Sequence, residues 1–527
     1  MNLSFQDTWE GDWTKGHAGG YGTDETDWRG QYDIWENKAG MIAESTKWTI
    51  DAAKKEGTIV YTVRQGIHWA LNPISPMSVK VNGRELTADD FAAYLTRTVT
   101  DSRAYLWKTN IPLRQAVVTK TGPWEVTVKV PLDTLITAIF RFGDACKIAP
   151  VELKDSPMVD WKDVSFGTGP YMTIDYVAGS TVTQVKNPNY WMKNPIGPGK
   201  GDQLPYIDKV KHILILDAST RQAAMRTGKI DTILYELDDA NMLRKQIPGM
   251  PEAPTGEPTK PLVSPESIDF PNDQEPFKDI RVRKALFMAT DLQTINKTLY
   301  SGLGVLESWP WQGVKGYEQL RVGVNDPDTP AEIKELYTYN PDKAKQLLKD
   351  AGFPTGFKTK AVMITDYVDF WSIIKEQWAK VGVDLSMDVM ESTARRNLIN
   401  SNTYKGFTDG GVASDCAFHT TPTLTGLPSA DANTVHLFDP KIDESLASIR
   451  MTILNSGMKA GMKEARELVK YVVGQAYAIP VPYLYKYQFW WPWLKGYTGE
   501  SSVGYYNMYN WPQYVWLDTS LKQSMGY

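Results

Sequence analysis

The chain has 527 residues, a net charge of −5 and an isoelectric point near 5.7. This length allows two or three domains with cores of their own. The sequence contains no long basic run, so a nucleic-acid partner is not expected. No stretch approaches the ~18 apolar residues of a membrane-spanning helix.

The cysteines and the first residues bear on the cellular compartment. Cys146 and Cys416 are the only cysteines, which excludes a disulfide framework but not a single bridge. Residues 1–16 have no basic region, apolar region or small-residue cleavage site, and no cysteine that could carry a lipid. We therefore expect either a cytoplasmic protein or one whose leader has been removed.

The first half of the chain alternates strands and helices. Strands are predicted at residues 58–64 and 124–130, where apolar residues alternate with polar ones. Between them, Thr87 and Asp90 form a capping box that predicts the start of a helix. A strand is predicted at residues 210–216, and the next helix should end at Gly228.

The stretch "GTGPYMTIDYVAGSTVTQVKNPNYW", residues 167–191, begins with a glycine pattern that could in principle cradle a phosphate. Pro170 removes a backbone donor, however, and no Gly-Lys-Ser/Thr follows. Residues on both sides of "VAGS" alternate as strands do. The stretch therefore predicts a β-hairpin rather than a phosphate site.

Helical patterns dominate after residues 247–276, a segment rich in Pro, Glu and Thr that marks a linker or a crossing between lobes. The clearest helix follows Asn340, with Pro341 at its first position and Gly352 after its end. Strands separated by helices of this length indicate α/β lobes with mixed sheets. The other predicted elements are helices around 279–291, 370–381 and 463–473, a strand at 383–389 and a strand interrupted by prolines at 478–485.

Several of these segments, in this order, resemble the large solute-binding proteins of ABC importers, the peptide/nickel/oligosaccharide-binding family 5. The resemblance covers roughly residues 45 to 520. It rests on "TIVYTVRQGIHW" with "LTADDF", "GTGPY" with "VKNPNYW", "FKDIRVRKALFMATD", "YNPDKAKQLLKDAGF" and "AIPVPYLYKYQFWWPWLKGY".

The resemblance implies an α/β, bilobal clamshell like that of periplasmic binding proteins of the cluster C type, with an extra subdomain inserted in the first lobe. It implies an extracytoplasmic protein, periplasmic or a cell-surface lipoprotein, that acts as a monomer with a membrane permease. The expected division is lobe I at 1–45, 160–264 and 490–527, the inserted subdomain at 46–159, lobe II at 265–489, and hinge crossings near 262–270 and 485–493.

Peptide-binding members of the family hold the ligand's ammonium group with an aspartate in the pattern Gly-Trp-x-x-Asp-Tyr. In "GVASDCAFHTTPTL", Asp415 matches this aspartate and Gly411 the glycine, whereas Val412 and Cys416 replace the aromatic residues. A carboxylate in a closed cleft pairs strongly with a cation. The alternative, an aspartate that caps its own loop, has about equal weight.

Other candidates would favour different ligands. Arg395 could receive a ligand carboxylate, although a solvated helix face is the commoner position for such a residue. Exposed tryptophans could stack on sugar rings, although a tryptophan is more often packed in a core. The aromatic candidates are Trp309, Trp311, Trp490 and Tyr483, the last on the expected hinge strand.

No His or Cys pair has metal-ligand spacing, and no cofactor is expected. The leading hypothesis is a binding protein that delivers an oligopeptide or oligosaccharide to an importer and has no catalytic activity. The alternative is a hydrolase for a glycan or peptide that uses Asp415, Cys416 and His419. Turnover abolished by substitution of Cys416 or Asp415 would distinguish the two.

Overall fold

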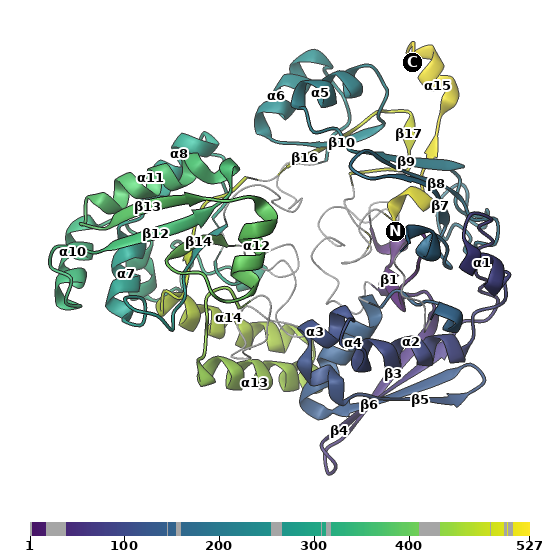
Figure 1. Ribbon diagram of the computed structural model, residues 1–527, viewed down its shortest axis with the longest axis horizontal. Coiled ribbons are helices and arrows are strands. Elements are labelled where there is room, and N and C mark those ends of the chain that lie inside the picture. The colour runs from purple at the N-terminus through teal and green to yellow at the C-terminus, as the bar shows by residue number, and fades with distance from the viewer. Residues whose placement is uncertain are drawn as a thin grey trace. The chain divides into compact units, whose positions relative to one another are not determined.

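The chain forms two compact units in the computed structural model. Unit 1 comprises Met1–Thr259 and Lys486–Tyr527, and unit 2 comprises Lys260–Tyr485. Most of their elements are labelled in Figure 1. The structure describes residues 3–16, 38–144, 146–153, 160–253, 266–306, 308–311, 318–410, 433–484, 486–499, 503 and 510–527.

Unit 1 contains a four-stranded antiparallel sheet in the order β3-β4-β6-β5. One face of this sheet is buried against α2, where Phe91 lies edge-on to Tyr61 with 5.2 Å between ring centroids. The capping box of Thr87 and Asp90 at the start of α2 is confirmed. The elements are β3 (Ala43–Asp51), β4 (Glu56–Val63), β5 (Val117–Gly122), β6 (Glu125–Pro131) and α2 (Ala88–Thr100).

The predicted hairpin is confirmed as β7 (Tyr171–Val177) and β8 (Thr181–Lys186), with β9 (Lys209–Ile213) as a third strand. The two glycines before this hairpin allow the N-terminal segment to pack closely against it. A Cβ on Gly167 would lie 2.1 Å from the carbonyl oxygen of Ser4, and one on Gly169 would lie 2.5 Å from that of Leu3. The glycine pattern therefore admits the N-terminal segment, whose carbonyl groups accept hydrogen bonds from the backbone of Gly169 and Tyr171.

The C-terminal segment of the chain completes unit 1. Strand β16 (Tyr487–Trp490) pairs antiparallel with β10 (Thr232–Tyr235). The rings of Trp491 and Trp493 stack at 4.4 Å in the adjacent core. The remaining elements of unit 1 are β1 (Trp9–Gly11), β2 (Lys38–Gly40), α1 (Pro76–Val81), α3 (Tyr105–Thr109), α4 (Leu135–Asp144), α5 (Ala218–Arg226), α6 (Leu237–Gln246), β17 (Leu494–Lys495), β18 (Trp516–Leu517) and α15 (Thr519–Ser524).

Unit 2 is built on a five-stranded mixed sheet in the order β13-β12-β14-β11-β15. Strand β12 runs parallel to β13 and β14, and β11 runs antiparallel to β14 and β15. The sheet strands are β11 (Ser267–Asp269), β12 (Lys358–Met363), β13 (Asp384–Val389), β14 (Phe407–Gly410) and β15 (Ile479–Pro480). The helices are α7 (Ile280–Met288), α8 (Leu292–Tyr300), α9 (Ala331–Leu336), α10 (Pro341–Asp350), α11 (Val368–Ala379), α12 (Ser392–Asn400), α13 (Pro440–Ser456) and α14 (Met458–Gly474).

The local signals in unit 2 explain these boundaries. Asn340 caps α10 by accepting a hydrogen bond from the backbone of Lys343 at 3.0 Å, as predicted. The strand expected at residues 478–485, interrupted by prolines, is present as β15, which covers only two residues. Pro480 and Pro482 lack the backbone N–H groups that a longer strand would need.

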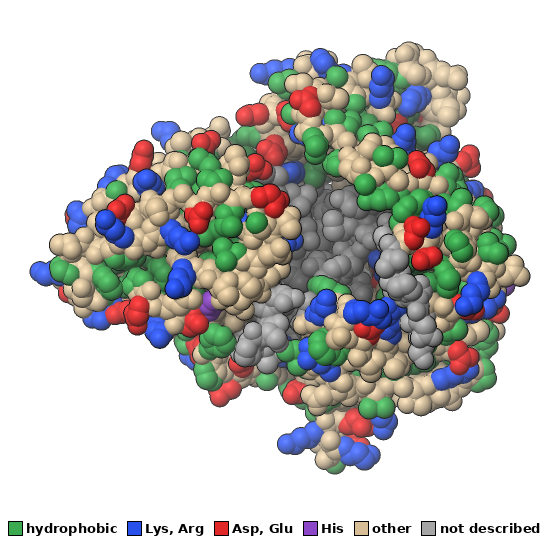
Figure 2. All heavy atoms as spheres, in the orientation of Figure 1, with side chains coloured by type: hydrophobic (Ala, Val, Ile, Leu, Met, Phe, Trp, Pro, Cys, Tyr) green, Lys and Arg blue, Asp and Glu red, His purple; other side chains and the backbone are tan. Residues whose placement is uncertain are grey.

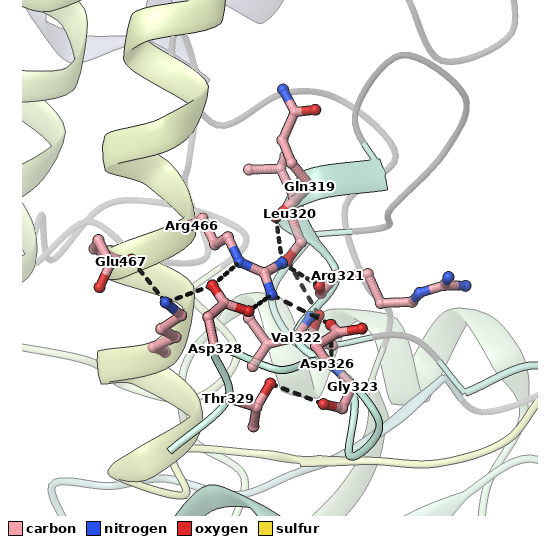
Figure 3. A network of polar contacts seen from close by, with 12 residues as sticks. Gln319, Leu320, Arg321, Val322, Gly323, Asp326, Asp328, Thr329, Arg466 and Glu467 are labelled. Carbon is pink, nitrogen blue, oxygen red and sulfur yellow. Dashed lines mark hydrogen bonds and ion pairs between the residues drawn. The ribbon is translucent and has the colours of Figure 1, made fainter.

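One arginine fixes a long connection in unit 2 to helix α14. The guanidinium of Arg466 donates to the carboxylates of Asp326 and Asp328 and to the carbonyl oxygens of Gln319 and Arg321 (Figure 3). We refer to these five residues as the Arg466 clasp. Lys470 of α14 also pairs with Asp328 at 2.8 Å, so two basic side chains of this helix hold the segment before α9.

Candidate functional site

The sheet of unit 2 has a point at which the chain changes direction across it. In the sheet, β13 and β14 lie on opposite sides of β12. Helix α11 connects β12 to β13, and α12 connects β13 to β14. Ligands of open α/β sheets bind at such a switch point, outside the carboxyl ends of the strands. The ends of β12 and β14, which we call the carboxyl edge, are therefore the candidate site. Figure 1 shows α12 beside β14.

Arg395 lies in the first turn of α12 and reaches the end of β14. Its Nη2 lies 2.6 Å from Oδ2 of Asp409 and donates to Oγ1 of Thr408 at 2.7 Å and to the carbonyl oxygen of Asp409 at 2.8 Å. The Arg395 side chain is 14% exposed and that of Asp409 is 8% exposed. Arg395 therefore forms an internal ion pair rather than a solvated helix face.

The position of β14 is set from both sides. Thr408 also donates from Oγ1 to the carbonyl oxygen of Val362 in β12 at 3.1 Å. On the other side, a Cβ on Gly410 would lie 2.2 Å from the carboxylate of Asp269 in β11. Only glycine admits this close approach of a buried carboxylate to the strand.

Two buried carboxylates face one guanidinium at this edge. Asp269 is 1% exposed and accepts hydrogen bonds from Ser267 and Thr434, yet burial raises its pKa. Burial also raises the pKa of Asp409 to about 6, against the opposite effect of Arg395. Tyr367, at the same edge, has a pKa raised to about 12 by burial and by the charge of Asp409. The carboxyl edge is thus acidic and poorly hydrated, which favours cations over anions.

The loop with the predicted aspartate follows this edge directly in the sequence. Gly411, Val412, Asp415, Cys416 and His419 all lie outside the described residues, which end at Gly410 and resume at Asn433. Their role stays a prediction.

The aromatic candidates lie in cores. Trp309 and Trp311 are each 1% exposed, and Tyr483 is fully buried and pairs with Val305 in an isolated β-bridge. Trp490 is 9% exposed and belongs to a cluster in unit 1 with Leu494, Tyr497 and Val515. In this structure none of these four rings presents a free face on which a sugar could stack.

Unit 1 contains a buried acid that the sequence reasoning missed. Glu10 is 3% exposed, and its Oε2 accepts a hydrogen bond from Asn510 at 2.7 Å. Burial, followed by the charge of Asp7, raises the pKa of Glu10 to about 8. Glu10 is therefore protonated near neutral pH. The residues around Glu10 gave no signal of this environment, because its hydrogen-bond partner Asn510 lies 500 positions away in the sequence.

Other functional signals are sparse across the described parts of the chain. No group of three His, Cys, Asp or Glu side chains there could hold a metal ion, and no helix there has the length and apolar character needed to cross a membrane. On the face shown in Figure 2, acidic and basic side chains are interspersed over the described surface.

Comparisons with curated proteins find relatives that bind small molecules. Haem-binding protein A of Haemophilus influenzae is 28% identical over 285 residues, which cover 49% of this chain and 45% of that protein. The glutathione-binding protein GsiB of Pectobacterium atrosepticum is 23% identical over 364 residues, which cover 66% and 65%. The matches thus span about half to two thirds of these relatives. Both are binding proteins, and the hydrolase alternative is not supported.

Solved structures share the fold over nearly the whole chain. The periplasmic binding protein DppA of Helicobacter pylori, in complex with the peptide STSA, has a TM-score of 0.69 at 17% identity and covers 98% of this chain and 92% of its own. The oligopeptide-binding protein AppA of Bacillus subtilis, with a nonapeptide, has a TM-score of 0.68 at 18% identity and covers 98% and 93%. The expected bilobal α/β fold of periplasmic binding proteins is therefore confirmed.

The family itself is shown by a direct match. The model described as bacterial extracellular solute-binding proteins, family 5 Middle, matches residues 40–425, which is more than half of the chain. The motifs that carried the resemblance and the architecture of both units agree with this match. The chain belongs to the bacterial extracellular solute-binding proteins of family 5.

Proposed function

We propose that this solute-binding protein captures an oligopeptide or a similar small ligand with a cationic group and delivers it to the permease of an ABC importer. The observation that carries the choice of ligand is the carboxyl edge of unit 2, where Asp269 and Asp409 face the single guanidinium of Arg395. An ammonium group would supply the missing positive charge.

An oligosaccharide is the second candidate ligand, and the burial of the aromatic side chains weighs against it. Sugar binding by stacking needs accessible ring faces, whereas Trp309, Trp311 and Trp490 are at most 9% exposed. The relatives named as binding glutathione and the peptide complexes of similar fold favour the peptide reading.

Within this proposal, Asp415 accepts the ligand's ammonium group and Gly411, Val412 and Cys416 surround it. The segment that contains them follows β14 directly in the sequence. Tyr483 and Arg395 contribute from within unit 2 by supporting the site rather than by an exposed surface.

The proposed cellular context follows from the family. We place the protein outside the cytoplasmic membrane, periplasmic or attached to the cell surface as a lipoprotein, and working as a monomer with the permease subunits. Ligand capture would involve closure of the two units about the crossings at 259/260 and 485/486. Small-angle scattering should then show a smaller radius of gyration with saturating ligand, and an unchanged radius with proven binding would contradict closure.

The direct test is to identify the ligand. Native mass spectrometry of the purified chain should show a co-purified small molecule, and calorimetric titration of the stripped protein should show binding of the dipeptide Met-Leu or of glutathione. A maltooligosaccharide is the matched neutral probe. Binding of the sugar alone would overturn the peptide proposal, and a steady increase of cleaved probe in proportion to protein would overturn the binding function.

A further inference from the structure

The buried carboxylate of Asp269 in β11 lies against two residues that flank the segment 411–432 in the sequence. A Cβ on Gly410, the last residue of β14, would lie 2.2 Å from both oxygens of Asp269. On the other flank, Oγ1 of Thr434 donates a hydrogen bond to Oδ2 of Asp269 at 2.7 Å. Asp269 is 1% exposed, so water cannot readily replace either contact. One side chain thus contacts both flanks of the segment that contains Asp415.

The residues that follow β11 hold residues 433–437, which we call the return turn, at two further points. The backbone N–H and the side chain of Asn272 both donate to the carbonyl oxygen of Val435 at 2.9 Å. Oδ1 of Asp273 lies 2.9 Å from Nδ1 of His436, whose side chain is 5% exposed. The return turn is therefore attached to the chain at the end of β11.

We propose that Asp269 is a positioning residue of the binding site, which fixes Gly410 and Thr434 relative to each other and thereby the two ends of the segment that contains Asp415. This inference rests on the proposed function for its effect on ligand binding but not for the local contacts. Holding both ends of a segment lowers the number of conformations that it must give up when a ligand binds. Loss of the Thr434 hydroxyl should therefore weaken binding, although the proposal places no atom of Thr434 on the ligand.

The two hydroxyl groups bound to Asp269 provide a matched pair of substitutions. Ser267 donates to Oδ1 at 2.6 Å from within β11, whereas Thr434 donates to Oδ2 from the return turn. Ser267→Ala and Thr434→Val each remove one buried hydrogen bond to the same carboxylate, so both should lower the thermal unfolding temperature by a similar amount. Only Thr434→Val releases a flank of the segment, and Thr434→Ser should restore the bond.

The local claim can be tested without a ligand. In hydrogen exchange of the full chain, Thr434→Val should lower the protection of the amides of residues 433–437, and also of residues 408–410 on the other flank, by about fivefold or more. Ser267→Ala and Thr434→Ser should keep residues 433–437 within about twofold of the wild type. Unchanged protection in Thr434→Val, a loss confined to residues 433–437, or an equal loss there in Ser267→Ala would overturn the proposal.

A second variant reaches the same carboxylate from the opposite flank. In Gly410→Ala the new Cβ would occupy the space of the Asp269 carboxylate, so protection of residues 433–437 should fall as it does in Thr434→Val. Combining the two substitutions should add little, because both act through one side chain. Additive losses of protection in the double variant would contradict coupling through Asp269.

Calorimetric titration then tests the effect on the solute. Met-Leu or glutathione, whichever binds the wild type, should bind Thr434→Val about fivefold or more weakly, and should bind Ser267→Ala and Thr434→Ser within about twofold of the wild type. Equal weakening by Ser267→Ala and Thr434→Val, or unchanged binding to Thr434→Val, would overturn the positioning role. If neither probe binds the wild type, the proposed solute class fails, and the exchange result alone decides whether Asp269 couples the two flanks.

Discussion

Two arginine–aspartate pairs in unit 2 have the same N–O distance, but the pKa of the aspartate is shifted in opposite directions. Nη2 of Arg466 lies 2.6 Å from Oδ1 of Asp328, and Nη2 of Arg395 lies 2.6 Å from Oδ2 of Asp409. The Asp328 side chain is 48% exposed, and hydrogen bonds from Arg466 lower its pKa. The Asp409 side chain is 8% exposed, and burial raises its pKa to about 6.

Asp328 also has Lys470 as a partner at 2.8 Å, but the raised pKa of Asp409 shows that desolvation of a carboxylate can outweigh the attraction of its arginine. Both carboxylates have an arginine at ideal distance, so the Coulombic attraction alone would depress both pKa values. The desolvation of Asp409 exceeds that gain, as expected for a buried ion pair. The clasp is therefore a stabilising feature at neutral pH, whereas the pair at the carboxyl edge retains a charge at a cost to stability.

Glu10 extends the comparison to an acid without an arginine and should give the largest effect. Its pKa is raised from 4.5 to about 8, which corresponds to about 3–5 kcal/mol. The folded pKa lies above the unfolded one, so the stability is full below about pH 4.5 and is lost as the pH rises toward 8. Glu10→Gln should raise the free energy of unfolding of unit 1 near pH 8 by about 3 kcal/mol in urea titrations.

The control for Glu10 is Glu44→Gln, because that side chain belongs to the same unit and is 61% exposed. This substitution should leave the pH dependence of unfolding unchanged. A Glu10→Gln variant that retains the wild-type loss of stability between about pH 5 and pH 8 would show that Glu10 is not the titrating acid.

Removal of the clasp should have the next largest effect. Arg466→Ala should lower the free energy of unfolding of unit 2 by about 2 kcal/mol, since its hydrogen bonds are lost but its carboxylate partners can be solvated. Arg321→Ala is the matched control, because only the backbone carbonyl of Arg321 takes part in the clasp (Figure 3). Equal destabilisation by both variants in thermal unfolding would contradict this account.

A smaller effect on stability should follow neutralisation of the two aspartates. Their contributions to stability should depend on pH with opposite signs. Near neutral pH, Asp409→Asn should change the stability of unit 2 by about 1 kcal/mol or less, because relief from desolvation offsets the weaker bond to Arg395. Asp328→Asn should lower it. The contribution of Asp328 is present above its ordinary pKa of 3.8 and is lost in acid, whereas that of Asp409 declines as the pH rises from about 4 to 6. Denaturant titrations at two pH values would measure both signs.

The sequence predicted elements well where the signal is local. The cap at Asn340, the stop at Gly352 and the inward residues Phe370, Ile374 and Trp378 depend on neighbours within one helix, and the structure confirms them. The prolines expected to interrupt the strand at 478–485 limit β15 to two residues.

The site was less predictable because burial of polar groups depends on tertiary contacts. Arg395 was recognised as a candidate, but its pairing with Asp409 joins α12 to β14. Asp269 and Gly410 were missed, although the double glycine after Asp409 could have indicated a close approach to the strand. The Asp415 loop stays a prediction.

The central claim is that a carboxylate of unit 2 meets a cationic group of the solute, and calorimetric titration of Asp415→Asn with Met-Leu or the co-purified ligand tests it most directly. Loss of one partner of a buried charge pair costs about 2–5 kcal/mol, or roughly thirtyfold or more in affinity. A neutral hydroxyl ligand would lose only about 1 kcal/mol. We expect a loss beyond about tenfold, and a loss below about threefold would contradict the account.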